Sequence, residues 1–301
     1  MAKRIISKKV TEQSKKKEKK ITADQICPAA KLEKLLLATD RSDFSEGAVR
    51  EAIKLAKTCG SKLHIISVTE TPDIRAFNYP LTAFEKLEIL TKQHLESLKG
   101  LAEKDGIICE TIIRRGPEAY KYIVDEAEKR KVDMIIMGRR GKTGITRLMV
   151  GSVTAKVIGY APCNVMVVPR FARITFEKIL VPTDGSIFSE LASREAISIA
   201  KLTKGSLIVL SVAKKEENLP FAEASVNIVK EFAEKEGVKI EALTLVGNPH
   251  EVIVETAEKQ KAGFIIIGSH GRSGIERILM GSVTERVIGH AGCAVLVVRK
   301  Q

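Results

Sequence analysis

The sequence predicts an α/β protein built from two tandem domains, each a doubly wound sheet of five parallel strands. Two observations lead to this fold class. Short runs of Val, Ile and Leu alternate with segments of helical spacing, and this alternating pattern occurs twice along the 301 residues. Parallel strands that helices cover on both faces are buried along their whole length, which produces such continuous apolar runs. A chain of this length also suits two domains better than one.

The second occurrence of the pattern shows the elements most clearly. We expect strands at 178–184, 206–212, 239–246, 263–268 and 293–300. Between them we expect helices at 189–203, at 224–237 with an end at Gly237, at 249–261 and at 282–291. Five strands and four helices in this order form an open, doubly wound sheet.

The two halves of the chain repeat one another. The segment LLLATDRSDFSEGA from Leu35 matches ILVPTDGSIFSELA from Ile179 at an offset of 144 residues. The segment GRRGKTGITRLMVGSVTAKVIG from Gly138 matches GSHGRSGIERILMGSVTERVIG from Gly268 at an offset of 130, with 12 of 22 positions identical. The chain is therefore a tandem duplication.

We divide the chain into a tail of residues 1–30, repeat one of residues 31–170 and repeat two of residues 171–301. The offset between the repeats falls by 14 residues between the second and third strands. Insertions of this kind usually lie at the surface, so repeat one is expected to carry a longer helix or lid there.

Charge and composition narrow the class of protein. The net charge is +13, and the tail alone holds nine Lys or Arg residues against three acidic ones, so we expect it to stay disordered until it meets an anionic partner. The tail has no apolar stretch for a signal peptide or a membrane span, and the expected location is the cytoplasm. Aromatic residues make up only 4% and Trp is absent, which disfavours a stacking platform for single-stranded nucleic acid.

The cysteine pattern predicts neither a disulfide framework nor a zinc site. Five cysteines are present, without a CxxC pair or a metal-ligand spacing. We therefore expect reduced, mostly buried thiols.

The repeated polar residues lie where a doubly wound sheet binds ligands, beyond the carboxyl ends of the strands. The first strand ends in Thr39-Asp40 in repeat one and in Pro182-Thr183-Asp184 in repeat two. The fourth strand ends in Gly138 or Gly268, and the next helix follows Gly151-Ser152 or Gly281-Ser282. A helix start favours phosphate, and an aspartate at a strand end accepts hydrogen bonds from ribose. The pattern therefore favours a nucleotide site.

Two segments near these residues also match other motifs. Ser282 and Glu285 fit a capping box, which would explain Ser282 without a ligand. The segment Gly141-Lys142-Thr143 matches the end of a P-loop, but Ile136 stands where the first glycine of that motif belongs. Phosphoryl transfer of the P-loop type is therefore not predicted.

The glycine spacing resembles the ATP-binding branch of the universal stress protein family. Both repeats contain a glycine, two residues, a glycine, nine residues and then Gly-Ser, and the resemblance covers nearly the whole chain from about residue 32. It implies a Rossmann-like fold of the adenine nucleotide alpha hydrolase kind, with ATP as the ligand and Mg²⁺ beside its phosphates. It departs from the family at Ala38, where proline is common, and at Arg139-Arg140, where Ser269-His270 are more typical. These two arginines would either contact the phosphates or face solvent, and solvent is slightly favoured because charged loop residues are usually solvated.

The resemblance also implies the residues that contact the nucleotide. Those in repeat one are Thr39, Asp40, Val68, Met137, Gly138, Arg139, Gly141, Gly151, Ser152, Val153 and Thr154. Those in repeat two are Pro182, Thr183, Asp184, Val212, Ile267, Gly268, Ser269, His270, Gly271, Gly281, Ser282, Val283 and Thr284. Val68 and Val212 would line the adenine pocket, the aspartates would hold the ribose side, and the glycine loops would hold the phosphates.

The last strand of each repeat resembles the edge through which family members pair. We expect the strands in NVMVVPR and AVLVVRK to pair antiparallel within the chain as a pseudo-dimer, joined by the link at 171–177, and to allow a homodimer.

Three functions remain open from the sequence. The first is an ATP-binding regulator of the stress response with little or no catalysis, because no catalytic constellation is evident around His270. The second is a slow ATP hydrolase or an adenylyl-transferring enzyme. The third and least favoured is binding of nucleic acid or an anionic membrane surface through the lysine-rich tail.

Overall fold

The computed structural model describes residues 26–29, 32–70, 81–141, 150–272 and 280–299. Repeat one consists of β1 (Lys34–Ala38), η2 (Asp43–Ser45), α1 (Glu46–Cys59), β2 (Lys62–Glu70), α2 (Leu81–Lys104), β3 (Cys109–Gly116), α3 (Ala119–Arg130), β4 (Met134–Gly138), α4 (Ser152–Tyr160) and β5 (Asn164–Val168). Repeat two consists of β6 (Lys178–Pro182), α5 (Ile187–Thr203), β7 (Ser206–Ala213), η3 (Glu216–Asn218), α6 (Leu219–Lys235), β8 (Lys239–Val246), α7 (Pro249–Lys259), β9 (Phe264–Gly268), α8 (Ser282–His290) and β10 (Ala294–Val298). The expected alternation of strands and helices is confirmed.

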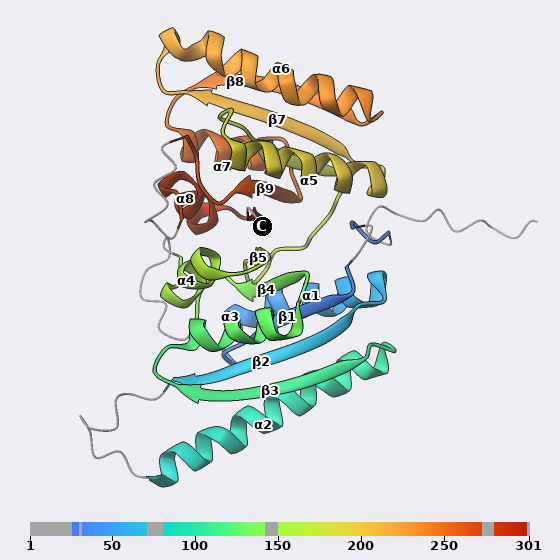
Figure 1. Ribbon diagram of the computed structural model, residues 1–301, viewed down its shortest axis with the longest axis vertical. Helices are drawn as coiled ribbons and strands as arrows, with labels where there is room; N and C mark the ends of the chain where they lie inside the picture. The colour runs from blue at the N-terminus through green and yellow to red at the C-terminus, as the bar shows by residue number, and fades with distance from the viewer. Residues whose placement is uncertain (1–25, 30–31, 71–80, 142–149, 273–279, 300–301) are drawn as a thin grey trace, which may run out of the picture.

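The ten strands form one continuous sheet in the order β3-β2-β1-β4-β5-β10-β9-β6-β7-β8 (Figure 1). Within each repeat the neighbouring strands are parallel. The strand order reverses between β1 and β4, and again between β6 and β9. These two switch points are the places where a doubly wound sheet opens a crevice at its carboxyl edge.

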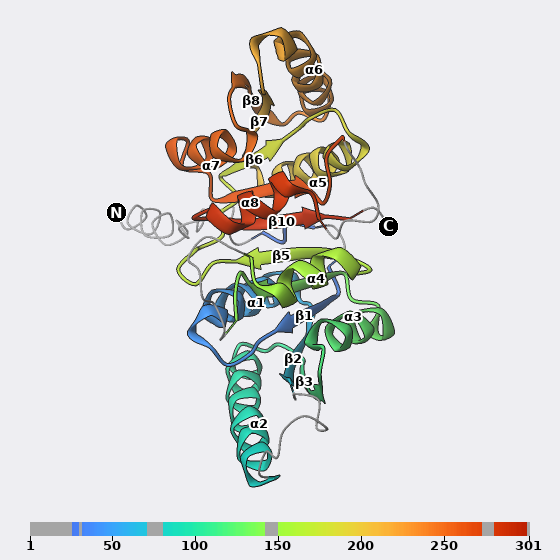
Figure 2. The same cartoon turned by 90° about the vertical axis from the view of Figure 1, so that its left-hand side faces the viewer.

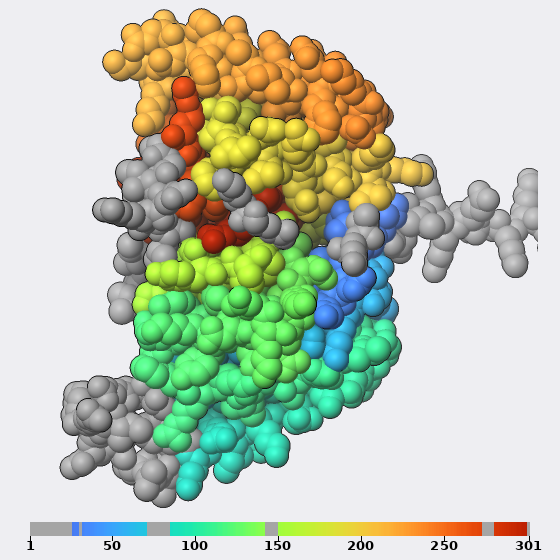
Figure 3. Space-filling view, viewed as in Figure 1, coloured from blue at the N-terminus to red at the C-terminus, as the bar shows by residue number. Residues whose placement is uncertain are grey.

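Helices cover both faces of the sheet and bury it in two layers. One apolar cluster joins the sheet to α1, α2, α5 and α6, and the other joins it to α3, α4, α7 and α8. The central strands β4, β9 and β10 are buried at every residue, as expected for strands covered on both sides. The two repeats lie one above the other along the long axis of the molecule, with repeat one at the bottom and repeat two at the top of Figure 3.

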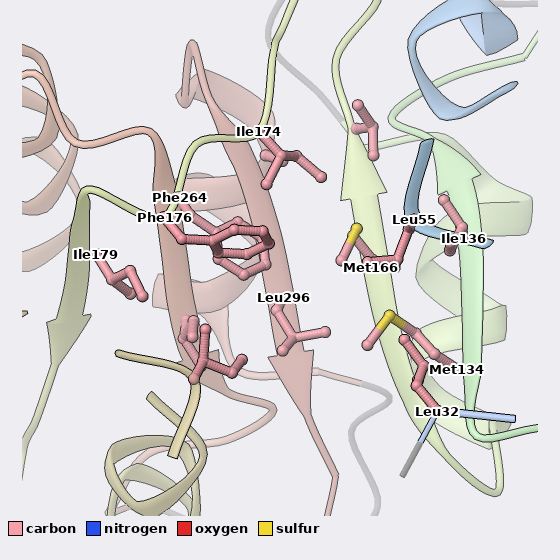
Figure 4. Packing of buried hydrophobic residues seen from close by; sticks show 14 of the residues in the cluster. Leu32, Leu55, Met134, Ile136, Met166, Ile174, Phe176, Ile179, Phe264 and Leu296 are labelled. Carbon is pink, nitrogen blue, oxygen red and sulfur yellow. The ribbon is translucent and has the colours of Figure 1, made fainter. Parts of the chain in front are cut away.

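The last strands of the two repeats join the halves of the sheet. β5 and β10 pair antiparallel, with Met166 opposite Leu296 and Val165 opposite Val297, and they run side by side at the middle of the molecule (Figure 2). Both side chains of the Met166–Leu296 pair lie in the same buried layer in Figure 4. The predicted antiparallel pairing within the chain is confirmed, whereas pairing between two chains stays a prediction.

The link between the repeats is packed onto α1. Ala172, Ile174 and Phe176 are buried, and the ring of Phe176 meets Phe264 edge to face at 5.6 Å between ring centres (Figure 4). The Ile174 amide donates to Glu51 of α1 over 3.4 Å, and Lys54 donates to the Ile174 carbonyl over 3.2 Å. The link is therefore part of the core and fixes repeat two against repeat one.

The longer segment predicted between the second and third strands of repeat one is confirmed. Helix α2 has 24 residues, whereas its counterpart α6 has 17. No helix among the described residues is long and apolar enough to span a membrane. The lysine-rich part of the tail, residues 1–25, and the Lys142-Thr143 pair lie outside the described residues.

The expectation that all cysteines are reduced is wrong. Cys27 and Cys59 form a disulfide with a Cα–Cα distance of 4.8 Å. The two residues are 32 positions apart, which matches no short motif, and they meet because the chain before β1 passes the end of α1. Cys109, Cys163 and Cys293 carry free thiols. Burial raises the pKa of the Cys163 thiol to about 12, so this thiol stays protonated.

Candidate functional site

Each switch point of the sheet opens into a cavity lined by the repeated polar residues. Crevice one lies at the carboxyl ends of β1 and β4 and has a volume of about 290 Å³, and crevice two lies at the ends of β6 and β9 and has about 510 Å³. In repeat two the pairing of β6 with β9 already ends at Leu180 and Ile265, so these strands part early. Crevice two therefore has the size of an ordinary small-molecule pocket.

The aspartate at the end of the first strand holds the turn that follows it, and in crevice two it also ties the strand to the glycine loop. In crevice two, Asp184 Oδ1 accepts the Ser186 amide over 3.0 Å, and Asp184 Oδ2 accepts the Arg272 amide over 2.9 Å. In crevice one, Asp40 Oδ1 accepts the amide and the hydroxyl of Ser42 over 3.0 and 2.6 Å. A carboxylate has about four acceptor sites, so it can still accept from a sugar hydroxyl after these bonds are made.

The second glycine of the spacing is required by this aspartate. A Cβ atom on Gly271 would lie 2.7 Å from Asp184 Oδ2, and one on Gly141 would lie 2.7 Å from Asp40 Oδ2. Any larger residue would push the carboxylate out of place. The repeated glycine thus serves the geometry of the crevice through the aspartate.

The first glycine has a different reason, which the sequence did not indicate. A Cβ atom on Gly268 would lie 2.7 Å from the backbone of Phe188, and one on Gly138 would lie 2.7 Å from the Phe44 carbonyl oxygen. This glycine lets the end of the fourth strand pack against the helical segment that follows the first strand. The space that a Cβ atom would occupy is therefore taken by the backbone of that helical segment.

The helix after the glycine loop begins differently from the capping-box interpretation, which is wrong. The N-cap of α8 is Gly281, in extended conformation and without a side-chain capping bond, so Ser282 is already the first helical residue. Helix α4 begins in the same way at Gly151 and Ser152. The first amides of a helix have no partner within it, so the exposed Ser152 and Ser282 stand at helix starts suited to an anion.

The threonine two residues later holds the helix start against the strand end. Thr284 Oγ1 donates to the Gly268 carbonyl over 2.8 Å, and Thr154 Oγ1 donates to the Gly138 carbonyl over 3.1 Å. Both threonines are buried. Their hydroxyl hydrogens are directed to these carbonyls, so in this structure the two threonines donate within the protein.

The threonine before the aspartate is likewise part of the turn. Thr39 Oγ1 lies 2.9 Å from Ser45 Oγ, and Thr183 Oγ1 lies 3.2 Å from Ser189 Oγ, in both cases buried. These contacts hold the strand end to the start of the next helix.

The structure brings nearly all of the predicted site residues together. Crevice one is lined by Thr39, Asp40, Val68, Met137, Gly138, Gly141, Gly151, Ser152, Val153 and Thr154. Crevice two is lined by Pro182, Thr183, Asp184, Val212, Ile267, Gly268, His270, Gly271, Gly281, Ser282, Val283 and Thr284. That these residues contact a nucleotide stays a prediction.

Two predicted residues do not line a crevice. Arg139 is half-buried, and its Nη1 donates to the carbonyls of Ala291 and Ile288 in repeat two over 3.0 and 3.4 Å, so its guanidinium lies at the end of α8 and outside the lining of crevice one. Ser269 is buried, its amide donates to the Val298 carbonyl over 3.1 Å, and its hydroxyl lies 3.1 Å from His270 Nδ1. Both residues lie where the repeats meet or where β9 meets β10.

The sequence comparisons agree with this architecture. The model of the Universal stress protein family matches the chain twice, over residues 31–169 and 175–299. The chain belongs to the universal stress protein family. A universal stress protein of Methanocaldococcus jannaschii is 42% identical over an alignment of 145 residues, and the match covers 42% of this chain and 83% of the relative. One of Synechocystis is 26% identical over an alignment of 290 residues, and the match covers 89% of this chain and 100% of the relative.

A solved universal stress protein has the same tandem fold. The crystal structure of a universal stress protein from Archaeoglobus fulgidus aligns with a TM-score of 0.73 and 23% identity. The alignment covers 90% of this chain and 100% of that chain. At this identity the likeness concerns the fold.

Several residues of this universal stress protein line the crevices without having been predicted. Crevice two also includes Lys214, Asn218, Phe221 and Arg272, and the guanidinium of Arg272 lies 3.8 Å from the centre of the Phe221 ring. Lys214 and Arg272 follow the predicted Val212 and Gly271 closely and could have been found by extending those segments. Asn218 comes from η3 and Phe221 from the start of α6, where no local motif marks them.

The two crevices of this universal stress protein differ in charge at one equivalent position. Glu70 lines crevice one, and Lys214, which is its counterpart at the offset of 144, lines crevice two. Glu70 is the last residue of β2 and Lys214 directly follows β7, and each stands two residues after the valine predicted to line the adenine pocket. The two crevices therefore carry opposite charges at this place.

Proposed function

We propose that each repeat binds an adenine nucleotide in its crevice, and that the protein is a nucleotide-dependent regulator of the stress response with little or no catalysis. The observation that carries the proposal is the shared construction of the two crevices. In each, an aspartate at the end of the first strand and a helix start after Gly-Ser line one cavity. An aspartate suits the ribose and a helix start suits the phosphates.

Crevice two has the stronger set of groups for a nucleotide triphosphate. Each crevice has two cationic side chains in its lining, Lys214 and Arg272 in crevice two and Arg41 and Arg140 in crevice one, but crevice two has one carboxylate where crevice one has two. Leu210, Val212 and Phe221 supply an apolar wall for a base in crevice two. An apolar wall with a few convergent polar groups is the usual composition of a nucleotide-sized pocket. We therefore expect crevice two to bind ATP more tightly than crevice one.

We expect Mg²⁺ to bind mainly through the phosphates of the nucleotide, because crevice two offers few metal ligands of its own. No cluster of three or more His, Cys, Asp or Glu residues suited to a metal ion occurs in the described part of the chain. The lining of crevice two contains one carboxylate, that of Asp184. Mg²⁺ commonly binds through one or two carboxylates together with substrate phosphates and water, so Asp184 is the protein group that would assist it.

The binding proposal is tested by blocking one crevice at a time with charge. Ser152→Glu and Ser282→Glu place a carboxylate at the first helical position, which the helix tolerates but a phosphate does not. Ser152→Gln and Ser282→Gln are neutral controls of the same size. Isothermal titration with ATP and Mg²⁺ should show two sites in the unmodified chain, one site in each Glu variant and two in each Gln variant. Absence of ATP binding by the folded, unmodified chain would overturn the proposal.

The expectation of little or no catalysis is tested by measuring ATP turnover with the same proteins. We expect release of phosphate from ATP to stay at the rate seen without protein. Turnover above that rate that Ser282→Glu abolishes and Ser282→Gln retains would instead establish the alternative of a slow hydrolase.

A further inference from the structure

The last turns of the two equivalent helices α4 and α8 are each capped by an arginine from the opposite repeat. Arg139 of repeat one donates to the Ala291 and Ile288 carbonyls at the end of α8, over 3.0 and 3.4 Å. Arg299 of repeat two donates to the Ile158 carbonyl at the end of α4, over 2.6 Å. Ile158 and Ile288 are equivalent at the offset of 130, so the same carbonyl is capped in both repeats.

The two arginines do not occupy equivalent positions. At the offset of 130, Arg139 corresponds to Ser269 and Arg299 corresponds to Pro169. Because β5 and β10 are antiparallel, the chain after β10 passes the start of β5, where the Arg299 amide donates to Asn164 over 3.0 Å. Proline can supply no such donor. In repeat one the capping residue is instead Arg139, which follows the end of β4 and donates to the end of α8.

Each arginine is also joined to the glycine loop of its own repeat. The Arg139 carbonyl accepts the Gly151 amide over 2.9 Å and so closes the loop of crevice one. Arg299 follows Val298, whose carbonyl accepts the Ser269 amide in the loop of crevice two over 3.1 Å. The backbone at or next to each arginine thus contacts the glycine loop of its own repeat. Its guanidinium binds the end of the helix that lines the crevice of the other repeat.

These caps act on short helices. Helices α4 and α8 each contain nine residues, so each is only about 13 Å long and both of its ends contribute to its orientation. The carbonyls of the last turn have no partner within the helix, and a cation there also complements the helix dipole. Burial lowers the pKa of both arginines, and Arg140 lowers that of Arg139 further, yet a guanidinium remains charged at neutral pH. A displaced last turn would move the whole helix, including its first amides.

We propose that the arginines are crossed positioning residues: Arg139 of repeat one positions α8 for ligand binding in crevice two, and Arg299 of repeat two positions α4 for ligand binding in crevice one. The inference rests on the proposed nucleotide binding and adds that each site depends on a side chain of the other repeat. Neither arginine touches the ligand.

The test measures one crevice at a time. Ser152→Glu leaves crevice two as the only ATP site, and Ser282→Glu leaves crevice one. Arg139→Ser and Arg299→Ser are then introduced into each background, serine being the residue found at the position equivalent to 139. We expect Arg139→Ser to raise the Kd for ATP at crevice two about threefold to tenfold and to leave crevice one within about twofold, and Arg299→Ser to do the reverse.

The crossed pattern separates positioning from general destabilisation. A variant that weakens both crevices equally, or that weakens the crevice of its own repeat, would overturn the inference while leaving the proposed function intact. If the unmodified chain binds no ATP, the proposed function and this inference both fail.

A measurement without ligand covers the case in which a serine variant binds too weakly. Amide hydrogen exchange in the unliganded, full-length chain should become faster in α8 with Arg139→Ser and in α4 with Arg299→Ser. Arg139→Lys, which keeps a cation and a donor, should restore slow exchange in α8. Unchanged exchange in both helices would contradict the inference.

Discussion

Thr284 donates its hydroxyl hydrogen to the carbonyl oxygen of Gly268 over 2.8 Å and thereby joins the first turn of α8 to the end of β9. The same bond occurs between Thr154 and Gly138 in repeat one, so it belongs to the construction of each crevice. Thr284→Val keeps the shape of the side chain and leaves the buried carbonyl without this donor.

We expect Thr284→Val to lower the free energy of unfolding by about 1–3 kcal/mol, the usual effect of leaving a buried polar group unsatisfied. Urea unfolding followed by circular dichroism measures it. Thr284→Ser is the control, because it retains the hydroxyl and loses only a methyl group. A Val variant as stable as the unmodified chain would show that the bond contributes nothing.

A side chain at position 271 is expected to displace the Asp184 carboxylate, because a Cβ on Gly271 would lie 2.7 Å from Asp184 Oδ2. Gly271→Ala should therefore displace the carboxylate and weaken ATP binding at crevice two by about tenfold, a loss typical of one misplaced hydrogen-bonding group. Titration calorimetry in the Ser152→Glu background measures this change. Gly292→Ala is the matched control, since a Cβ there would meet no atom within 4 Å. Equal affinities of the two alanine variants would contradict the role of Gly271.

Much of the fold could be predicted because it depends on local patterns. Buried parallel strands form continuous apolar runs, and the duplicated segments place equivalent turns at equivalent strand ends. Once the strand order was fixed, the topology brought Asp184, Gly271 and Ser282 to one edge of the sheet. These residues belong to short segments whose order and spacing are visible in the sequence.

The features that were missed depend on contacts between distant segments. Arg139 was expected in the glycine loop of crevice one, either at the phosphates or in solvent, but its side chain extends to the end of α8, 152 residues away. The Cys27–Cys59 disulfide forms because the chain before β1 passes the end of α1, which no spacing rule indicates. Phe221 reaches crevice two from α6, where the lengths of the repeats differ. Such contacts follow from packing of the whole molecule.

The Cys27–Cys59 disulfide should stabilise the folded chain. It joins residues 32 positions apart. Closing a loop of this size lowers the entropy of the unfolded chain and stabilises the folded state by about 2–4 kcal/mol. We therefore expect a reducing agent to lower the urea midpoint of the unmodified chain and to leave that of Cys27→Ser unchanged. Cys293→Ser is the control, because Cys293 carries a free thiol and this variant should still respond to the reductant. A midpoint insensitive to reduction would contradict a stabilising role.

A buried histidine in repeat one is expected to make stability depend on pH. His64 is 3% exposed, and its Nδ1 lies 3.2 Å from Arg130 Nη1 and 3.3 Å from Glu110 Oε2. Burial, followed by the charge of Arg130, lowers the pKa of His64, although Glu110 acts in the opposite direction. Arg130 also donates to Glu110 over 2.8 Å, which partly neutralises that carboxylate. The folded state therefore favours the neutral imidazole.

The unfolded chain binds a proton at His64 before the folded chain does, because an unperturbed histidine has a pKa of about 6.5. Between that value and the lower pKa of the folded state the unfolded chain holds more protons, so the free energy of unfolding decreases as the pH falls through this window. We expect His64→Gln to lose less stability than the unmodified chain between about pH 7.5 and about pH 5.5. Urea unfolding at each pH measures the difference. His250→Gln is a useful comparison, since burial lowers the pKa of His250 as well and its removal should reduce the slope in the same direction. If His64→Gln has the same slope as the unmodified chain, the folded state does not disfavour the imidazolium at this position.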